Sequence, residues 1–394
     1  MQKIASFLIQ KHGLYDSFYI ANMDILRNKI LDWRSFLPTV KPYYAMKCNP
    51  DETILKEMIA NNTGFDCASR NEIATVLKLG ANPSDIIFAH PVKKIDDLKY
   101  AVTQGIRYTT FDSISELQKI KDYAPNMQCV IRLRVDNPSA RVQLGLKYGA
   151  AQHEYKELVD YAQQSDLEIV GTSFHVGSAS KDPNVFRDGI SYCKDVFAYA
   201  KSKGFKNMHL LDIGGGFTKE TFKDAAGVIS ESISEHFPST PSKPFTMKVI
   251  AEPGRYFAEE TFSFFTPVIG QKEKDGRIEY WMSDGLYGSF NCIIYDQQIP
   301  TYQVLRNPLL GPLSDPDIDD APRPSILWGA SCDTYDKITQ ETIDLPLLRN
   351  GDYIHLDNFG AYTISAAKDF NGIKMTNIPT YYVGEGSFHT TLPN

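Results

Sequence analysis

Short apolar runs alternate with longer amphipathic stretches from about residue 40 to residue 255. The short runs are rich in β-branched and aromatic residues and predict strands, whereas the stretches between them predict helices. This alternation indicates a parallel sheet whose strands are joined by helical crossovers. The number of strands predicts an α/β fold with a (β/α)8 barrel, and an open doubly wound sheet is the alternative. The predicted strands are 43–47, 64–67, 86–90, 107–111, 128–135, 167–175, 208–213 and 247–252.

Local signals mark the ends of several predicted helices. Ser69 with Glu72, and Ser113 with Glu116, match the capping box, in which a serine and an acidic side chain bind backbone N–H groups at a helix start. The segment 184–204 has apolar residues at helical spacing and ends in a glycine, which suits the end of a helix. These signals support helices between the strands.

The alternation stops after residue 256, where the chain changes to β-rich segments joined by turns. These segments are RIEYWMSDG, NCIIYD, SILWG, DYIHLDN and PTYYVG, and they predict an antiparallel β domain. Residues 18–26 also predict a strand of this domain. We therefore predict a barrel domain of residues 27–255 and a β-rich domain of residues 1–26 and 256–394. The Pro- and Asp-rich stretch 307–324 predicts an exposed loop.

The composition disfavours several classes of function. The formal net charge is −7, so the sequence gives no indication of a surface for nucleic acid or an anionic membrane. No apolar run approaches the ~20 residues of a membrane-spanning helix, and the opening apolar run is too short and interrupted for a signal peptide. The six cysteines are scattered without zinc-type spacing. They predict reduced thiols in a cytoplasmic protein and no metal site.

Polar residues stand at the ends of the predicted strands. In a βα barrel the carboxyl ends of all strands meet at one face, and that face carries the functional site. One polar residue at a strand end indicates little, but several that converge on one rim indicate a site. These residues are Lys47, Asp66, His90, Arg132, His175, the glycines after strand 208–213, and Glu252.

Lys47 closes the apolar run 42–46. A lysine that follows a buried strand is partly desolvated, and this suits its amine to imine chemistry. Asp66, at the end of the next strand, is placed to pair with that amine and orient it. Taken alone, a lysine in this position is more often one that extends into solvent, and an aspartate is as often a turn residue.

A glycine triplet, 214–216, follows the strand 208–213. Backbone N–H groups in such a loop form a phosphate cradle, and phosphate sites of barrels lie after the last two strands. The motif EPGR at 252–255 ends the next strand, so Arg255 is placed to bind the same phosphate. A flexible turn for the glycines, and a surface ion pair for Glu252 and Arg255, are the alternatives.

Glu252 and His175 add features of a cofactor site. A carboxylate at Glu252 is placed to hold the N–H of a pyridinium ring, which keeps the ring electron-withdrawing, as pyridoxal phosphate requires. His175 is placed to stack on a flat ring, although an isolated histidine is more often a core residue bonded to backbone. An amine, a phosphate cradle and a partner for the ring nitrogen together favour pyridoxal phosphate.

The chain resembles the ornithine decarboxylase family, which combines an alanine-racemase-like barrel with a β domain. The matching segments are PYYAMKCNP, FDCAS, SFHVGS, LDIGGGF, AEPGRYF, DGLYGSFNCIIYD, GASCDTYD and LDNFGAYT, and FNG at 370–372 extends them. The resemblance implies that Lys47 is catalytic and forms the imine with pyridoxal 5'-phosphate. It further implies the cofactor-binding residues Asp66, Arg132, His175, Ser178, Gly214, Gly215, Gly216, Glu252, Gly254, Arg255 and Tyr362.

The resemblance also implies how the substrate is bound. Cys332 would be the second catalytic residue and return a proton to the substrate Cα after carbon dioxide leaves. Asp296 and Asp333 would bind the distal ammonium of a small cationic amino acid, since a desolvated cation requires paired negative charge. Tyr295 and Phe370 would also contact the substrate. The family resemblance implies a head-to-tail homodimer with shared active sites, in which Cys332 and Asp333 reach the site of the other subunit.

The expected reaction is the decarboxylation of L-ornithine to putrescine in polyamine biosynthesis. Decarboxylation of arginine or lysine by the same residues is the alternative. Diaminopimelate decarboxylation is less favoured, because relatives that use that substrate carry Cys-Glu-Ser where this chain has Cys-Asp-Thr at 332–334.

A non-catalytic regulatory homologue is the remaining alternative. Such homologues lose cofactor residues, whereas this chain keeps Lys47, Glu252, Arg255 and Cys332. His90 departs from the asparagine that is usual in the family, and we assign it no catalytic role.

Overall fold

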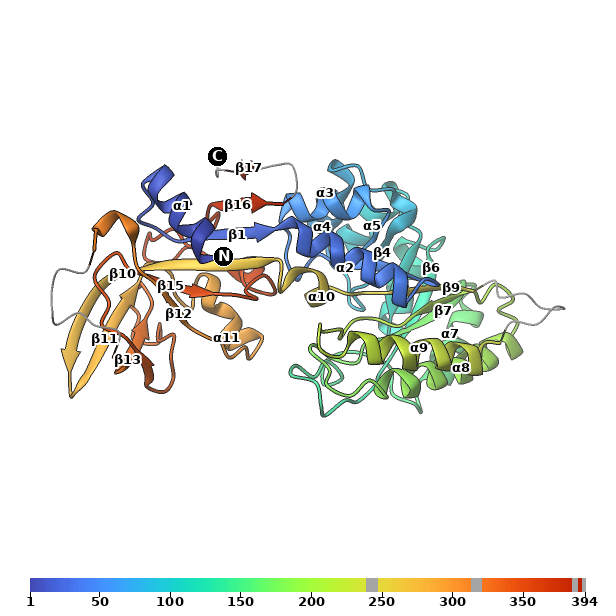
Figure 1. The fold of residues 1–394 in the computed structure, drawn as a ribbon. Helices are drawn as coiled ribbons and strands as arrows, with labels where there is room; N and C mark the ends of the chain where they lie inside the picture. The colour runs from blue at the N-terminus through green and yellow to red at the C-terminus, as the bar shows by residue number, and fades with distance from the viewer. Residues whose placement is uncertain (239–246, 313–320, 385–388, 392–394) are drawn as a thin grey trace. The chain divides into compact units, whose positions relative to one another are not determined.

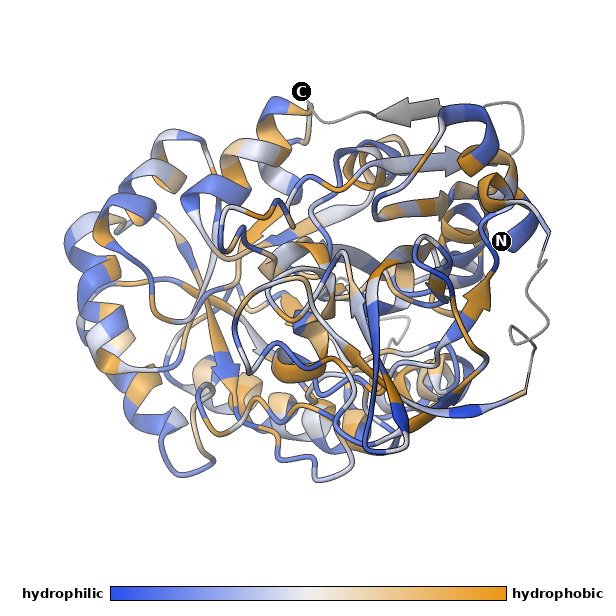
Figure 2. Ribbon diagram, turned by 90° about the vertical axis from the view of Figure 1, so that its left-hand side faces the viewer, coloured by the Kyte–Doolittle hydropathy of each residue, from blue (hydrophilic) through white to orange (hydrophobic). Residues whose placement is uncertain are grey.

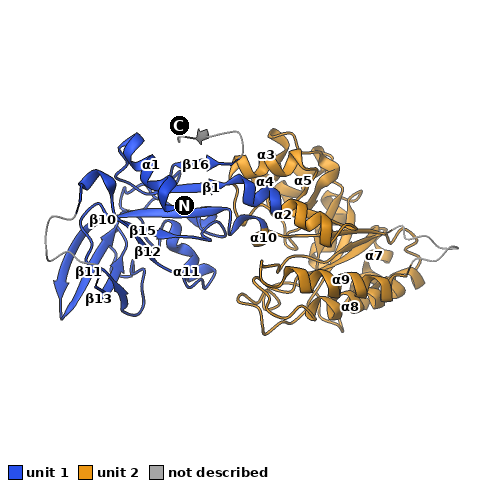
Figure 3. Ribbon diagram, viewed as in Figure 1, with its two compact units in different colours: residues 1–28, 257–394 blue, residues 29–256 orange. Residues whose placement is uncertain are grey.

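The computed structural model describes residues 1–238, 247–312, 321–384 and 389–391. The chain divides into two compact units, shown in different colours in Figure 3. Residues 29–256 form the first, called here the barrel unit, and residues 1–28 with 257–394 form the second, called here the β unit.

The barrel unit is built on eight parallel strands that close into a barrel, as the sequence predicts. Each strand pairs with the next, and the last closes on the first in a register that pairs Val40 with Val249. The strands end one to three residues before several of the predicted polar positions, so Lys47 lies two residues beyond its strand. The strands are β2 (Val40–Ala45), β3 (Gly64–Cys67), β4 (Ile86–Phe88), β5 (Tyr108–Phe111), β6 (Gln128–Leu133), β7 (Ile169–Phe174), β8 (Leu210–Asp212) and β9 (Lys248–Ala251).

Helices follow the strands in alternation and are labelled in Figure 1. They carry both hydrophilic and hydrophobic residues, as Figure 2 shows, which is the pattern of helices with one face on a sheet. The helices are α3 (Glu52–Ala60), α4 (Arg70–Lys78), α5 (Ile95–Thr103), α6 (Ile114–Tyr123), α7 (Tyr155–Gln164), α8 (Val185–Ser202), α9 (Phe222–His236) and α10 (Arg255–Ala258), and α2 (Met23–Phe36) precedes β2.

The two predicted capping boxes have different outcomes. Ser69 and Ser113 both accept the expected backbone N–H, from Glu72 and Glu116 respectively. Glu72 also turns back to the backbone, at the N–H of Ala68. The carboxylate of Glu116 instead binds Lys93 Nζ at 2.8 Å. Both side chains of this pair are buried, so removing one partner would cost about 3–5 kcal/mol.

Mostly apolar side chains from nearly all of the barrel strands form one buried cluster. Strands that are covered on both faces bury nearly every residue, as β7 does throughout its length. Each such aliphatic or aromatic side chain contributes about 1.5–3 kcal/mol when it is removed from water. The cluster consists of Tyr43, Ile87, Ala89, Tyr108, Val130, Val170, Leu210 and Ile250. The carboxyl face of the barrel is therefore held on a rigid support.

The β unit is a mostly antiparallel sheet, as predicted, with two parallel strand pairs. β1 pairs in parallel with β16, and β11 pairs in parallel with β13. The described strands are β1 (Phe18–Asn22), β10 (Phe262–Lys274), β11 (Arg277–Met282), β12 (Gln303–Leu305), β13 (Arg323–Trp328), β14 (Ile343–Leu345), β15 (Tyr353–Leu356), β16 (Thr380–Val383) and β17 (His389–Thr391). The predicted strand at 18–26 is confirmed for 18–22, but α2 begins at Met23.

Two segments of the β unit differ from the sequence prediction or extend it. NCIIYD is not a strand, because residues 292–295 form the short helix α11 (Cys292–Tyr295) after a 3₁₀ turn. The opening residues form helix α1 (Gln2–His12), which ends at a left-handed glycine, Gly13. In the predicted loop 307–324, residues 308–310 form a 3₁₀ turn and β13 starts at 323, while 313–320 lie outside the described residues. Among the described helices, none has the length and apolar content to cross a membrane.

Candidate active site

Lys47 and Asp66 form an ion pair at the carboxyl face of the barrel. The Lys47 amine lies 2.6 Å from Asp66 Oδ2, so the predicted pairing of these side chains is confirmed. Asp66 lies in β3 and is 1% exposed, whereas the Lys47 side chain is 42% exposed. The desolvation expected for Lys47 is therefore incomplete within a single chain. The buried carboxylate fixes the direction of an amine that remains accessible.

Glu252 directly follows β9 and stands beside a second buried acid, Asp212, at the end of β8. The two carboxyl groups lie within hydrogen-bonding range of each other. Burial raises the pKa of Asp212 to about 7. Burial, followed by the charges of Asp212 and Asp66, raises the pKa of Glu252 well above its usual range, while Lys47 and Arg132 act in the opposite direction. Five charged groups from different strands therefore share one small region.

The glycine triplet makes a tight loop after β8. Gly214 and Gly216 have positive φ angles of 61° and 116°, which favour glycine. A Cβ on Gly215 would lie 2.6 Å from the carbonyl oxygen of Glu252 and 2.8 Å from His175 Nε2. The loop therefore admits no side chain at this point, and the space beside it is kept for another group.

Arg255 begins the turn α10 and is buried. One guanidinium nitrogen donates a hydrogen bond to Ser178 Oγ at 3.0 Å. The segment that carries Ser178 is tied to the loop after β6 by two backbone hydrogen bonds with Val142. Two of the predicted phosphate ligands are thus in contact with each other.

His175 follows β7 and accepts a hydrogen bond at Nδ1 from the N–H of Gly177. Burial, and then the positive charges of Arg132 and Lys47, lower the pKa of His175 well below its usual range. The ring is therefore neutral with its proton on Nε2, and it offers a flat uncharged face.

A short chain of side chains crosses the same rim. The guanidinium of Arg132 lies over the ring of Tyr148, with 5.4 Å between carbon and centroid. His90 meets the same ring edge-on at 5.6 Å between centroids. His90 Nδ1 accepts the N–H of Val92. His90 and Arg132 thus contact the same ring, and the absence of a catalytic role for His90 stays a prediction.

The β unit holds the residues that the sequence assigns to the substrate. Tyr287 donates a hydrogen bond to Asp333 Oδ2, and its ring stacks on Phe370 with 4.1 Å between centroids. The backbone N–H of Cys332 donates to Asn371 Oδ1 at 2.9 Å. Cys332 is the one exposed cysteine of the six, all of which are free. We call Tyr287, Cys332, Asp333, Phe370 and Asn371 the loop cluster.

Comparison with known proteins identifies the family. The pyridoxal-binding domain of the pyridoxal-dependent decarboxylases matches residues 23–259. The chain belongs to this family. The fold class, the cofactor and the enzyme class that the sequence predicts are thereby confirmed at the level of the family.

The relatives of this pyridoxal-dependent decarboxylase include enzymes with different basic substrates. Ornithine decarboxylase of Schizosaccharomyces pombe is 38% identical, over 92% of this chain and 83% of its own. The arginine decarboxylase of Paramecium bursaria Chlorella virus, solved with agmatine, is 40% identical with a TM-score of 0.89, over 97% of this chain and 100% of its own. Antizyme inhibitor 2 of Xenopus laevis is 36% identical, over 93% of this chain and 81% of its own.

The barrel residues of this decarboxylase fit pyridoxal phosphate. Asp66 Oδ1 and Ser173 Oγ are buried and have no hydrogen-bond partner among the residues that the structure describes, so polar atoms are left for a bound group. The loop at Gly215 packs closely on Glu252 and His175, so a Cβ there would clash with both residues. An amine, a carboxyl pair, a neutral ring and an arginine bound to a serine line the same face, which matches the chemical groups of the cofactor.

The roles of all the predicted site residues of the decarboxylase stay predictions, and the structure places the remaining ones as follows. Asp296 ends α11 and is buried, and its N–H donates to the carbonyl of Cys292. Tyr295 is 69% exposed. Tyr362 is partly exposed and has a left-handed backbone with φ of 58°. The cofactor role of Gly254 also stays a prediction, and a Cβ at this position would lie 2.7 Å from Cys48 Cβ.

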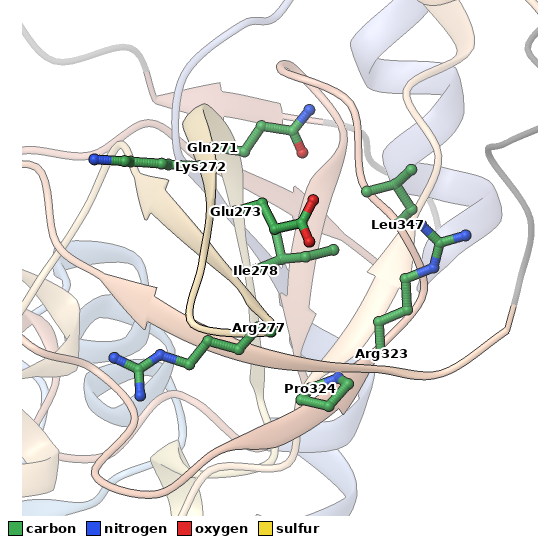
Figure 4. Close-up of a pocket in the computed structure, with 9 residues that line it drawn as sticks. Gln271, Lys272, Glu273, Arg277, Ile278, Arg323, Pro324 and Leu347 are labelled. Atoms are coloured by element: carbon green, nitrogen blue, oxygen red, sulfur yellow. The ribbon is translucent and has the colours of Figure 1, made fainter.

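A separate pocket of the β unit has no part in this site. Figure 4 shows side chains that line it along β10, β11 and β13. The pocket has a volume of about 410 Å³. Arg277 already pairs with Glu279 at 2.9 Å. We therefore assign this pocket no catalytic role.

Sequence reasoning missed two residues of the decarboxylase site. Asp212 ends a barrel strand just before the glycine triplet, so the strand-end argument that found Glu252 also applies to it. Tyr287 lies in the matching segment DGLYGSF, but its contact with Asp333 joins positions 46 residues apart. The sequence carries no local signal for such a contact.

Proposed function

We propose that this chain decarboxylates a basic amino acid, with L-ornithine as the preferred substrate and putrescine as the product. The observation that carries the proposal is the Lys47–Asp66 pair of 2.6 Å beside the buried carboxyls of Asp212 and Glu252. An accessible amine that is oriented by a buried carboxylate is the arrangement that imine chemistry requires. Residues 27–255 are assigned as the cofactor-binding domain, and residues 1–26 with 256–394 as the β-rich domain.

Pyridoxal phosphate, when bound, would accept the electron pair that remains on the substrate Cα as carbon dioxide leaves. Glu252 would bind the ring nitrogen and keep it protonated. His175 would support one face of the ring. Arg255, Ser178, Tyr362 and the N–H groups of 214–216 would hold the phosphate group, and Asp66 would keep Lys47 Nζ directed at the carbonyl carbon of the cofactor.

Proton transfer would be divided between Lys47 and Cys332. Lys47 Nζ would be the amine that holds the cofactor, and it would accept and return a proton at the substrate amine. Cys332 Sγ would deliver a proton to the substrate Cα. Asp66 carries a negative charge and Arg132 a positive charge near Lys47. Together they would offset changes in the charge of Lys47 during these transfers.

The loop cluster would receive the distal ammonium of the substrate. Tyr287 donates a hydrogen bond to Asp333 Oδ2, and the backbone N–H of Tyr335 donates one to Asp333 Oδ1. These two bonds orient the carboxylate, and a cation would bind at its remaining face. Asp296, Tyr295 and Phe370 would complete this end of the site. We propose a homodimer in which the loop cluster of one subunit completes the barrel site of the other.

Parallel assays of carbon dioxide release from ornithine, arginine and lysine test the substrate. The ornithine decarboxylases among the relatives support ornithine, and the 40% identity with a viral arginine decarboxylase favours arginine as the second candidate. A higher kcat/KM with arginine or lysine than with ornithine would overturn the preference. Diaminopimelate serves as the control for a zwitterionic distal group.

The same assay tests the non-catalytic alternative. The relatives include an antizyme inhibitor, but Lys47, Glu252, Arg255 and Cys332 are all present in this chain. The protein with pyridoxal phosphate should show a near-visible absorbance band. A protein that gains no such band and releases no carbon dioxide would be a regulator.

We further propose a cytoplasmic location and a role in polyamine biosynthesis. Six free cysteines without a disulfide support a reducing compartment. Fractionation of cells that express the chain would test the location, and measurement of their putrescine content would test the role.

A further inference from the structure

Asp212 has no role in the reaction described so far, although it is fully buried inside the barrel. It is the last residue of β8 and pairs in register with Ser173 of β7. Its Oδ1 accepts the N–H of Gly214 at 2.9 Å, and the carbonyl of Gly214 accepts the N–H of Glu252 at 2.6 Å. The glycine loop therefore links the backbone of Glu252 to the side chain of Asp212.

The two carboxyl groups also meet directly. Asp212 and Glu252 lie within hydrogen-bonding range, and each is at most 6% exposed. Two carboxylates cannot both carry a charge at this separation in a buried site without a large energetic cost, so one proton is retained between them. The question is which of the two acids holds it.

We propose that Asp212 is a positioning residue that stays a neutral carboxylic acid and donates a hydrogen bond to Glu252, so that Glu252 presents its carboxylate to the ring nitrogen. This inference rests on the proposed function, since it assigns a ring nitrogen to Glu252. Asp212 Oδ1 accepts from Gly214, whereas Asp212 Oδ2 is buried and has no hydrogen-bond partner among the described residues, so a proton on Oδ2 directed at Glu252 would satisfy it.

The charge of the ring nitrogen decides this assignment, because burial and the protein charges by themselves raise the pKa of Glu252 well above its usual range and that of Asp212 to about 7. The groups that face the pair are Asp66 from β3, Arg132 from β6, and Lys47 after β2, together with the neutral His175 after β7. Asp66 and Arg132 act on both acids, and Lys47 acts on Glu252 in addition. A protonated ring nitrogen at Glu252 adds a further positive charge on that side of the pair. The negative charge therefore belongs on Glu252 and the proton on Asp212.

Infrared spectroscopy near neutral pH tests the position of the proton, since a buried protonated acid has a C=O band that a carboxylate lacks. Asp284→Asn is the matched control, because Asp284 of the β unit is also a buried acid whose pKa is raised to about 7. Without pyridoxal phosphate, a band beyond that of Asp284 should be present and should disappear in the double variant Asp212→Asn/Glu252→Gln. With pyridoxal phosphate, it should disappear in Asp212→Asn alone.

Two infrared outcomes overturn the proposal. One is the absence of any band beyond that of Asp284 in the wild type. The other is a band that survives Asp212→Asn in the presence of pyridoxal phosphate but disappears in Glu252→Gln. The measurement without pyridoxal phosphate separates this inference from the proposed function, because a protein that fails to bind the cofactor can still show the shared proton.

Cofactor affinity, measured by fluorescence quenching of the apo-protein, gives a second test. An asparagine at 212 keeps an acceptor for Gly214 and a donor for Glu252, so Asp212→Asn should bind pyridoxal phosphate within about threefold of the wild type. Asp212→Ala removes both bonds and should weaken binding about tenfold or more. Equal weakening by both variants would show that an ionised Asp212 is required and would overturn the proposal. Circular dichroism would show whether each variant is folded. If Asp212→Ala does not fold, the affinity of Asp212→Asn alone decides the test.

Discussion

The carboxyl face of the barrel and the loop cluster of the β unit differ in how completely a single chain builds them. At the barrel face, Asp66, Asp212 and Glu252 are buried, and Asp66 pairs with Lys47. In the loop cluster, Cys332 is exposed and Asp333 is partly exposed. The barrel site is therefore organised by strands whose ends are fixed, while the loop cluster lacks the covering that would desolvate a bound cation.

Large exposed side chains accompany the loop cluster. Tyr335 is 85% exposed, Tyr295 is 69% exposed and Ile294 is 55% exposed. Tyr295 acts electrostatically on Tyr287, which places it near the cluster. Exposed aromatic and aliphatic groups around polar residues are typical of an interface core. This difference between the two regions supports a site that is completed by a second subunit.

Replacement of Lys47 should have the largest effect, because it removes the one amine that the barrel face orients. Lys47→Ala should lower kcat about 10³-fold or more and abolish the near-visible band. Lys41→Ala is the matched control, since Lys41 lies on the same strand but pairs with Asp85 at 2.6 Å. If Lys47→Ala were as active as the Lys41→Ala control, the barrel face would have no part in the reaction.

Replacement of Cys332 tests whether the two regions act across subunits. Cys332→Ala should lower kcat about 10²-fold, as for loss of a general acid. An equal mixture of Cys332→Ala and Lys47→Ala should recover about a quarter of wild-type activity, because half of the randomly formed dimers carry one intact site of two. Recovery that stays at the level of the single variants would contradict the shared site.

Tyr287 and Asp333 test whether the loop cluster recognises substrate. Asp333→Asn should raise KM, and Tyr287→Phe should raise it about tenfold with kcat nearly unchanged, as expected for one hydrogen bond to a charged group. Tyr335→Phe is the control, because its side chain is exposed and it contacts Asp333 only through its backbone. A fall in kcat without a change in KM would assign Tyr287 to the chemical step instead.

His90 should have the smallest effect and one that depends on pH. Burial, followed by Lys93, lowers the pKa of His90 below its usual value of 6.5. As the pH falls, the unfolded chain therefore binds a proton at His90 before the folded chain does. The neutral, partly buried His90 ring thus contributes to stability above pH 6.5, and this contribution is lost as the pH falls through the lower pKa of the folded chain. His90→Asn should change Tm by only a few degrees and reduce its fall below pH 6.5. Thermal melts at several pH values would detect this, and an unchanged pH profile would contradict it.

Much of the site follows from the sequence, because strand ends in a parallel barrel converge by geometry. The positions of Lys47, Asp66, Glu252 and the glycine triplet are set by where apolar runs stop. The contact of Arg255 with Ser178 joins positions 77 residues apart, and the family resemblance rather than periodicity anticipated that both belong to the site.

The tertiary structure decided what the pattern leaves open. Apolar periodicity fixes which face of a strand is buried, but it does not fix which partner a buried charge finds. Glu116 was predicted to cap a helix, but its carboxylate binds Lys93 instead. The segment NCIIYD was predicted to be β-rich, but it forms a helical turn. Asp212 shows the same limit, since its importance depends on its distance from Glu252 across two neighbouring strands. The sequence by itself determined the barrel and the positions at its rim, while the pairing of charges inside that rim was decided by packing in three dimensions.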